Sequence, residues 1–240
     1  MPTAPILKLV LGTLPTPHKR AVVVVASGGL DSAVLLRLMQ TWAGPEGHAR
    51  ALSIDYGQRH LREIGYAHKF CAQGGIPHKV VYLSALGGIL TGSSQTDPTI
   101  PVPEGHYEDE SMKTTVVPNR NMIILSVAIG YAIAEECSFV ACGAHAGDHA
   151  IYPDCRPSFL WGMDHMATIC HYTPIHVLAP FLELTKAQIV SLGVALQVPF
   201  EDTWSCYNSG PIHCGKCGTC VERREAFELA GVTDPTKYMQ

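Results

Sequence analysis

The stretch VVVVASGGLDSAVLLRL, residues 22–38, sets the fold because it joins an apolar strand to a helix through two glycines. Its near-continuous valines are typical of a strand in a parallel sheet that is covered on both faces. Gly28 and Gly29 let backbone amides approach a ligand closely. The first amides of the following helix lack partners and carry the positive end of the helix dipole. The stretch therefore predicts a phosphate or pyrophosphate site.

Strands and helices alternate along the rest of the chain. The apolar patterns predict strands over 21–26, 49–55, 78–83, 138–143 and 176–178, and helices over 33–42, 60–73, 121–137, 159–170, 185–196 and 221–230. This alternation predicts an α/β fold with a doubly wound, mostly parallel sheet, in which ligands lie beyond the carboxyl ends of the strands.

Three parts of the chain are expected from these patterns. Residues 1–20, rich in proline and without period, are expected to form a loose N-terminal arm, and residues 21–200 the phosphate-binding α/β domain. Residues 201–240 form a cysteine-rich C-terminal segment. Within the domain, residues 84–118 show little periodicity and are expected to be a long functional loop or lid.

Composition and charge limit the possible functions. The 240 residues are 47% hydrophobic, enough for a full core, and a net charge of −4 argues against long nucleic acid as a partner. The longest apolar run, 122–134, has 13 residues, which is shorter than the roughly 20 that a membrane-spanning helix needs. With no recognisable signal peptide and nine cysteines, an odd number, the chain is expected to be cytoplasmic and not bound to a membrane.

The hexapeptide around the two glycines differs from the common phosphate-binding motifs. It contains no lysine and is therefore not a Walker A loop, and its glycines do not have the G-x-G-x-x-G spacing. Ser27 and Ser32 can add hydroxyl donors, while Asp31 can contact a Mg²⁺ ion on the phosphates or orient the turn. The alternative is an ordinary strand end at which Asp31 caps a helix.

Four cysteines crowd into the C-terminal segment. Cys206, Cys214, Cys217 and Cys220 follow the pattern C-x7-C-x2-C-x2-C, which matches a tetrahedral Zn²⁺ ion held by thiolates. An iron–sulfur cluster is the chemical alternative. A closed site with four thiolate ligands has no position for a substrate, so we expect one structural zinc ion that folds the segment.

Several motifs in a fixed order carry a resemblance over roughly residues 21–229. They are SGGLDS at 27–32, DYGQRH at 55–60, VPNRN at 117–121, YPDCR at 152–156, LTKAQIV at 184–190, and TWSCY with HCGKCGTCVERREAF within 203–227. In these motifs the chain resembles the QueC family of 7-cyano-7-deazaguanine synthases, within the PP-loop, or N-type ATP pyrophosphatase, superfamily. Asn119 stands where the family commonly has glycine, and asparagine tolerates the left-handed backbone.

The resemblance implies an adenine nucleotide α-hydrolase-like fold and a reaction. Such enzymes are ATP-dependent ligases that convert 7-carboxy-7-deazaguanine and ammonia to 7-cyano-7-deazaguanine, releasing AMP and pyrophosphate, on the route to queuosine. The alternatives are a homologue that stops at the amide or passes the activated deazaguanine to another acceptor, and another PP-loop tRNA-modifying enzyme. Relatives also suggest a homodimer. A zinc-ribbon module for nucleic acid fits poorly with the acidic charge balance.

The resemblance also implies the residues of the site. The ATP-binding residues would be Ala26, Ser27, Gly28, Gly29, Leu30, Asp31, Ser32, Ala33, Val34, Leu35 and Leu36, with Asp55 and Tyr56 beside the adenine. The catalytic candidates are Ser27, Asp31, Ser32, Lys186, Arg120 and Arg156. The candidates for binding the deazaguanine are Gln58, Arg59, Asn121, Asp148, Tyr152 and Asp154.

Each of these roles has an ordinary structural alternative. Lys186 lies near the phosphates in the family pattern but could be a solvated lysine at a helix start. Arg120 and Arg156 can clamp a carboxylate or phosphate, or form structural ion pairs. Asp148 or Asp154 could accept hydrogen bonds from the guanine-like edge, as carboxylates do from base donors. Cys155 is expected to be a packed, inert thiol, because activation by ATP needs no covalent enzyme intermediate.

Overall fold

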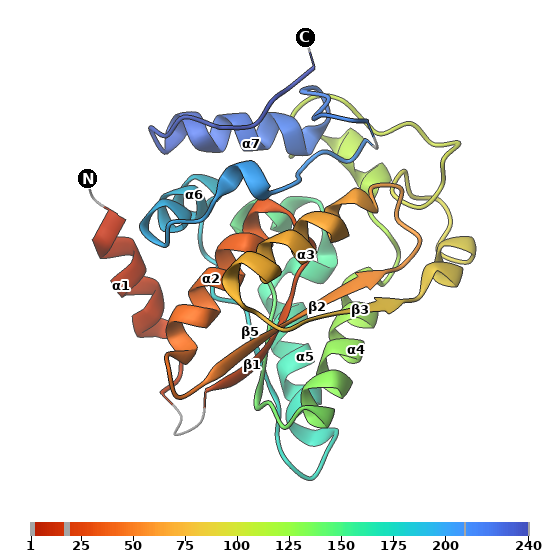
Figure 1. Cartoon of the computed structure of the whole chain (residues 1–240). Helices are drawn as coiled ribbons and strands as arrows, with labels where there is room; N and C mark the ends of the chain where they lie inside the picture. Colours follow the sequence, from red (N-terminus) through yellow and green to blue (C-terminus); the bar gives the residue numbers. More distant parts are fainter. Residues whose placement is uncertain (1–2, 17–19, 209, 240) are drawn as a thin grey trace.

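The computed structural model describes residues 3–16, 20–208 and 210–239. The sheet in these residues has the strand order β3-β2-β1-β4-β5, and each pair of neighbouring strands is parallel (Figure 1). Its strands are β1 (Ala21–Val25), β2 (His48–Asp55), β3 (His78–Tyr82), β4 (Phe139–Ala141) and β5 (His176–Leu178). The expected doubly wound parallel sheet is confirmed.

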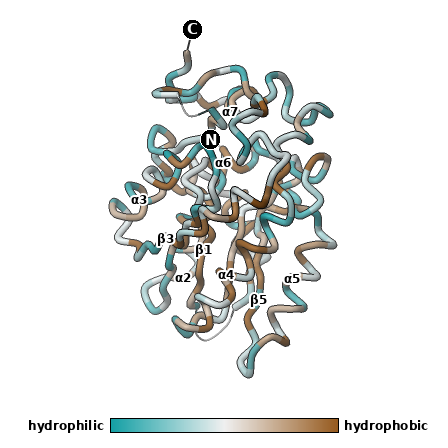
Figure 2. The backbone as a smooth tube through the Cα atoms, turned by 90° about the vertical axis from the view of Figure 1, so that its right-hand side faces the viewer, coloured by the Kyte–Doolittle hydropathy of each residue, from teal (hydrophilic) through white to brown (hydrophobic). Residues whose placement is uncertain are grey.

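Helices cover both faces of this sheet. They are α1 (Thr3–Thr13), α2 (Leu30–Ala43), α3 (Arg62–Gly74), α4 (Arg120–Ala134), α5 (Pro157–Ile169), α6 (Lys186–Ala195) and α7 (Gly218–Leu229). Val22 and Val24 of β1 face one core with side chains of α1, α2, α3, α6 and α7, while Ala21 and Val23 face another with α4 and α5. Burial on both faces explains why β1 is apolar at every position, and Figure 2 shows the hydrophobic strands in the interior.

The N-terminal residues correct one expectation. Residues 3–13 form α1 rather than a loose arm, while residues 1–2 and 17–19 of the expected arm lie outside the described residues. Val10 and Leu14 are buried in the core that contains α2 and α6. This part of the chain therefore belongs to the packed body of the protein.

The long connection 84–118 is irregular, as expected, but it is tied to the C-terminal segment. It contains two short 3₁₀ helices, η1 (Ser84–Gly88) and η2 (Glu110–Thr115). The amide of Gly105 donates to the carbonyl of Lys216 at 3.1 Å.

Three further 3₁₀ helices are η3 (Ala146–Ala150), η4 (Pro153–Cys155) and η5 (Phe200–Asp202).

The start of α6 has a reciprocal helix cap. The Thr185 hydroxyl accepts from the Gln188 amide at 3.3 Å, and the Gln188 side chain accepts from the Thr185 amide at 2.9 Å. This reciprocal pair satisfies two amides that the first helical turn would otherwise leave without partners. It also holds Lys186 at the first position of the helix.

The strand order places a crevice beside β1. The chain moves outward from β1 to β2 and β3, then returns to add β4 on the other side of β1. Ligands of open parallel sheets bind at such a reversal, outside the carboxyl ends of the strands. Residues 26–32, which follow β1, and residues 142–150, which follow β4, meet there. Within the described ranges, no helix has both the length and the apolar character needed to cross a membrane.

Candidate functional site

The turn after β1 has the geometry of an anion site. Gly28 has a φ of 97°, and a Cβ there would lie 1.9 Å from the carbonyl oxygen of Glu63, so only glycine fits. The Gly28 amide donates to Ser32 Oγ at 3.0 Å, and the Gly29 amide donates to Ser27 Oγ at 3.2 Å. The next amides, of residues 30–32, begin α2 and have no acceptor within the helix. They can therefore receive a phosphate oxygen.

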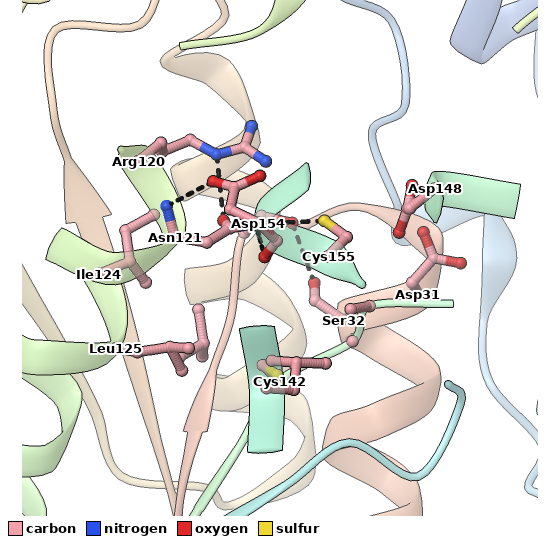
Figure 3. A pocket seen from close by; sticks show the side chains of 15 residues that line it. Asp31, Ser32, Arg120, Asn121, Ile124, Leu125, Cys142, Asp148, Asp154 and Cys155 are labelled. Atoms are coloured by element: carbon pink, nitrogen blue, oxygen red, sulfur yellow. Dashed lines mark hydrogen bonds between the residues drawn. The ribbon is translucent and has the colours of Figure 1, made fainter. Parts of the chain in front are cut away.

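Two adjoining cavities open at this turn. The first has a volume of about 170 Å³ and the second a volume of about 220 Å³. The residues that line both include Ser27 and Asp31 from the turn, Arg120 and Asn121 from α4, and Asp148 from η3. Figure 3 shows most of these side chains around the first cavity, brought together from segments far apart in the chain. The predicted crevice at the strand reversal is thus a real cavity.

The cavities extend from the turn in different directions. The first cavity extends past the carboxyl end of β4, where Cys142 and Asp154 line it. The second runs toward β2 and α3 and is lined there by Tyr56, Glu63 and Tyr207. Because both include the turn, two ligands bound in them would meet beside the free amides of α2.

Lys186 lies between two carboxylates at this site. Its Nζ donates to Asp31 Oδ2 at 2.6 Å and lies 3.2 Å from Glu222 Oε2. Burial alone would lower the pKa of Lys186, but the two carboxylates raise it well above its usual value. Burial alone would raise the pKa of Asp31, but the Lys186 ammonium holds it below its usual value. The lysine is therefore a buried, permanent cation next to the anion site.

The other acidic side chains of the site are held in fixed orientations. Asp148 accepts hydrogen bonds from Tyr107 Oη at 3.0 Å and from the His145 amide at 3.1 Å. Asp154 Oδ2 accepts from the Asn121 amide at 3.0 Å, and Asn121 Nδ2 donates back to the Asp154 carbonyl at 3.1 Å. A carboxylate accepts up to about four hydrogen bonds, so each retains capacity for a ligand.

Most of the predicted polar residues line the cavities. Those that do so are Ser27, Asp31, Ser32, Arg120, Asn121, Asp148, Tyr152 and Asp154, with Ala26 and Tyr56. Other residues of the predicted ATP-binding segment pack inside the protein, namely Leu30, Ala33, Val34, Leu35 and Leu36. Their side chains fix the orientation of α2. Within this segment, the residues that line the cavities are Ala26 and Ser27 of the turn and Asp31 and Ser32 at the start of α2.

Four predicted residues lie elsewhere. Asp55 accepts from the Gly57 amide at 2.9 Å, and Gln58 uses its side chain to bond the Tyr56 amide and the Ile54 carbonyl. The Arg59 guanidinium donates to the carbonyl of residue 97 at 3.2 Å. Arg156 is exposed and donates to the carbonyl of residue 149 at 3.0 Å. None of the four lines either cavity, so the structure gives their predicted ligand roles no support.

Sequence reasoning did not assign several side chains that reach the site. Among them, Glu63 comes from α3, Tyr207 from the loop that follows Cys206, and Glu222 from α7. Burial raises the pKa of Glu63 to about 8, so this carboxyl is mostly protonated at neutral pH. Tyr207 and Glu222 belong to the motifs TWSCY and VERREAF, and Glu63 follows DYGQRH, but a motif does not reveal which of its residues or neighbours points inward.

Cys155 behaves as an inert thiol. It is buried, and burial raises its pKa well above the usual value for a thiol. Asn121 Nδ2 donates to its Sγ at 3.2 Å. Nucleophilic cysteines need a depressed pKa, so the environment of Cys155 agrees with the expected packing role.

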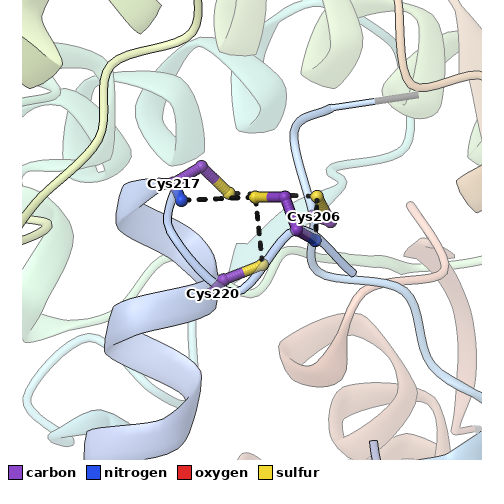
Figure 4. A group of neighbouring side chains, drawn as sticks. Cys206, Cys217 and Cys220 are labelled. Carbon is purple, nitrogen blue, oxygen red and sulfur yellow. Dashed lines mark hydrogen bonds between the residues drawn. The ribbon is translucent and has the colours of Figure 1, made fainter. Parts of the chain in front are cut away.

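The four cysteines of the C-terminal segment form a group that can hold a metal. Their sulfur atoms all lie within 4.8 Å of one another, with Cys214 and Cys220 at 3.9 Å and Cys206 and Cys217 at 4.0 Å (Figure 4). A tetrahedral site with bonds of about 2.3 Å has edges of about 3.8 Å. Backbone amides also point at the sulfurs, including that of Cys217 toward Cys214 Sγ at 3.3 Å. Such donors stabilise thiolates, which are the form that binds metals.

Comparison with known sequences finds close relatives. The model of one family, described as "Queuosine biosynthesis protein QueC", matches residues 21–231. A protein of Pseudoalteromonas translucida named 7-cyano-7-deazaguanine synthase is 51% identical over 219 residues, which cover 90% of this chain and 98% of that protein. A protein of the same name from Rhizobium etli is 50% identical over 218 residues, covering 90% and 91% of the two chains.

Comparison with solved structures supports the fold. The U34-tRNA thiolase NcsA from Methanococcus maripaludis, solved with its [4Fe-4S] cluster, matches 95% of this chain and 70% of its own at a TM-score of 0.52 and 18% identity. An NH3-dependent NAD synthetase from Campylobacter jejuni matches 83% and 74% of the two chains at a TM-score of 0.50 and 14% identity. At these identities the likeness concerns the fold alone.

Proposed function

Since this chain belongs to the QueC family, we propose that it is an ATP-dependent ligase that makes 7-cyano-7-deazaguanine from 7-carboxy-7-deazaguanine and ammonia. The observation that carries the proposal is the pair of cavities that meet at Ser27 and Asp31. A carboxylate bound in one cavity would lie beside the α-phosphate of a nucleotide bound in the other. That juxtaposition is what adenylation requires.

The chemistry follows from the poor reactivity of a carboxylate toward ammonia. Attack of a substrate carboxylate oxygen on the α-phosphorus releases pyrophosphate and forms an acyl adenylate. Ammonia then attacks the acyl carbon, AMP leaves, and loss of a proton gives the amide. A second ATP activates the amide oxygen in the same way, and loss of AMP and a proton gives the nitrile. One phosphate site serves both activations.

The residues of the chain have distinct parts in this proposal. The amides of residues 30–32 and the Lys186 ammonium neutralise the charge that the phosphates carry and gain during attack. Asp31 contacts the Mg²⁺ ion that accompanies ATP. Arg120 lies where the cavities join and can clamp the substrate carboxylate. Asp148 and Asp154 accept from the donors of the deazaguanine ring.

The metal that we propose for the four cysteines is one zinc ion with a structural role. Four sulfurs within 4.8 Å of one another leave room for a single ion between them, whereas a four-iron cluster would hold its cysteine sulfurs further apart. All four ligand positions are then taken by the protein, which leaves none for a substrate. A homodimer and a cytoplasmic location stay predictions, to be tested by light scattering and cell fractionation.

The test is a defined incubation followed by mass spectrometry. Purified protein with ATP, Mg²⁺, ammonium and 7-carboxy-7-deazaguanine should give the nitrile and AMP. Amide as the final product would support the alternative of a homologue that stops at that stage, and release of ADP would contradict every PP-loop assignment. Asp31→Ala and Ser27→Ala should abolish AMP formation while the protein stays folded, and wild-type turnover in both would refute the assigned site.

A further inference from the structure

Glu222 is a buried carboxylate that the proposed chemistry leaves without a part. It lies on the second turn of α7, outside the nucleotide turn, and its side chain is 12% exposed. Its Oε2 is 3.2 Å from Lys186 Nζ, yet this buried oxygen makes no aligned hydrogen bond with the ammonium or with any other described group. Burying a charged oxygen without a hydrogen bond is costly. This oxygen is therefore available to accept a hydrogen bond.

The hydrogen-bond partner of Lys186 is Asp31 instead. Nζ donates to Asp31 Oδ2 at 2.6 Å, while Asp31 Oδ1 is buried and has no hydrogen-bond partner among the described residues. Both carboxylates beside the single ammonium thus retain one unused oxygen. This arrangement allows the Lys186 ammonium to move its hydrogen bond from Asp31 to Glu222.

His145 does not compete for the lysine. Its Nδ1 accepts from the Gly147 amide at 3.1 Å, so we assign the proton of the neutral ring to Nε2. Nε2–H cannot accept from Lys186 Nζ, although the two atoms lie 3.2 Å apart. Its nearest acceptors are Asp148 Oδ1 at 3.6 Å and Glu222 Oε1 at 3.8 Å. At these distances Nε2 makes no hydrogen bond to either carboxylate, so Glu222 stays available to the lysine.

The backbone under Glu222 is anchored on both sides. Cys217 and Cys220 belong to the metal-binding group, and Arg223 is fully buried with bonds to Thr203 Oγ1 at 2.7 Å and to the carbonyl of Phe200 at 3.1 Å. A carboxylate on so rigid a support can fix the position of a flexible lysine.

We propose that Glu222 is a positioning residue that holds Lys186 against the phosphates once a bound nucleotide engages Asp31. The inference rests on the proposed function, because it assumes that a polyphosphate with its divalent cation binds at the turn. The cation draws Asp31 away, the Lys186 ammonium turns toward Glu222 Oε2, and its remaining N–H groups face the phosphate oxygens. Glu222 thus acts through Lys186 and touches neither substrate.

The charge-neutral variant Glu222→Gln tests this role, with Glu225→Gln as the matched control. Glu225 lies on the same helix, points outward and pairs with His106 at 3.1 Å. E222Q should lower kcat for AMP formation by about tenfold to a hundredfold, the cost of a misplaced catalytic group. Its affinity for ATP, measured by calorimetry, should stay unchanged or rise, because one negative charge near the phosphates is gone. E225Q should match the wild type, and E222D should recover part of kcat.

The outcomes separate this inference from the proposed function. A wild-type protein that forms no AMP with its substrates would refute the function itself. An active wild type with an E222Q variant of equal kcat would overturn the role of Glu222. Weaker ATP binding by E222Q, or loss of its metal or a clearly lower unfolding temperature, would also overturn it, since Glu222 would then serve binding or folding instead.

Discussion

Glu63 illustrates how burial sets the charge of a side chain in the second cavity. Its carboxyl is 12% exposed, and Gln58 Nε2 lies 3.3 Å and His60 Nε2 3.4 Å from its Oε1. Burial raises the pKa of Glu63 to about 8 and lowers the pKa of His60 to about 3. Burial disfavours the charged form of each group. At neutral pH both side chains are therefore mostly uncharged, and Arg120 supplies the positive charge that acts on them.

The raised pKa of Glu63 predicts a pH-dependent stability. Between its usual pKa of 4.5 and about 8, the folded protein binds a proton at Glu63 that the unfolded chain has lost. The free energy of unfolding should therefore fall as pH rises through this window. Glu63→Gln has no proton to lose, so from pH 5 to pH 8 it should gain roughly 3 kcal/mol relative to the wild type. Urea unfolding at several pH values measures the difference.

The exposed Glu228 supplies a control for this experiment. Glu228→Gln should follow the wild-type pH profile. If E63Q follows it as well, the buried carboxyl ionises normally and our description of the cavity is wrong.

At the scale of elements, α1 is a helix that the sequence pattern does not predict, although it packs in the core. Val10 is 2% exposed and packs in the core that holds α2 and α6, whereas the neighbouring Leu9 is 65% exposed. Val10→Ala should lower the free energy of unfolding by about 2 kcal/mol, through lost burial and the cavity left behind. Leu9→Ala should change it by less than about 0.5 kcal/mol, as surface substitutions usually do. Denaturant unfolding of both variants measures this, and equal effects would mean that α1 is not docked.

The elements of the sheet could be predicted because their signals are local. The valines of β1, the cap at Thr185 and the glycines after the first strand each fix their neighbours' conformation. The segment TAPILKLVLGT of α1 lacks such a signal, because its residues are almost uniformly apolar and show no helical periodicity. Pro5 also suggests a break, although proline is tolerated in the first turn of a helix. Asn119 adopts φ 58°, the left-handed backbone that asparagine tolerates.

The candidate site was predictable where a motif also sets side-chain direction. Asp31 and Asn121 stand in the first turns of helices that begin at the crevice, so their side chains face it. Arg156 belongs to an equally distinctive motif but points to the surface, where it bonds the backbone of residue 149. Glu222 is 191 positions from Asp31 in the chain, and only the packing of α7 over α6 brings it to the lysine (Figure 1). Such tertiary placement leaves no mark on the local sequence.

On the scale of the whole molecule, the cysteine segment and the nucleotide turn form one connected structure. The Trp204 amide, two residues before the first cysteine of the group, donates to the Gly28 carbonyl at 2.9 Å. After the last cysteine, α7 carries Glu222 to Lys186. The C-terminal segment thus contacts the phosphate site from both ends of the metal-binding group.

This connection predicts that metal and nucleotide binding are coupled. Removing the metal with a chelator, or replacing one ligand in Cys217→Ser, should free residues 203–220 and with them the bond from Trp204 to Gly28. ATP affinity should then fall by about tenfold, a typical coupling between sites, and thermodynamic reciprocity requires ATP to strengthen metal retention by the same factor. Calorimetry with ATP, metal analysis and hydrogen exchange over residues 27–32 measure the three effects.

Cys170 on the surface provides the control for the metal experiment, because it lies outside the four-cysteine group. Cys170→Ser should keep the metal and bind ATP as the wild type does. A metal-free protein that binds ATP with wild-type affinity, and whose turn at 27–32 exchanges no faster, would show that the segment folds and functions independently of the nucleotide site. In that case Glu222 would also need a support other than the metal, and the rigidity of α7 would have to come from the Arg223 bonds and from its packing in the core.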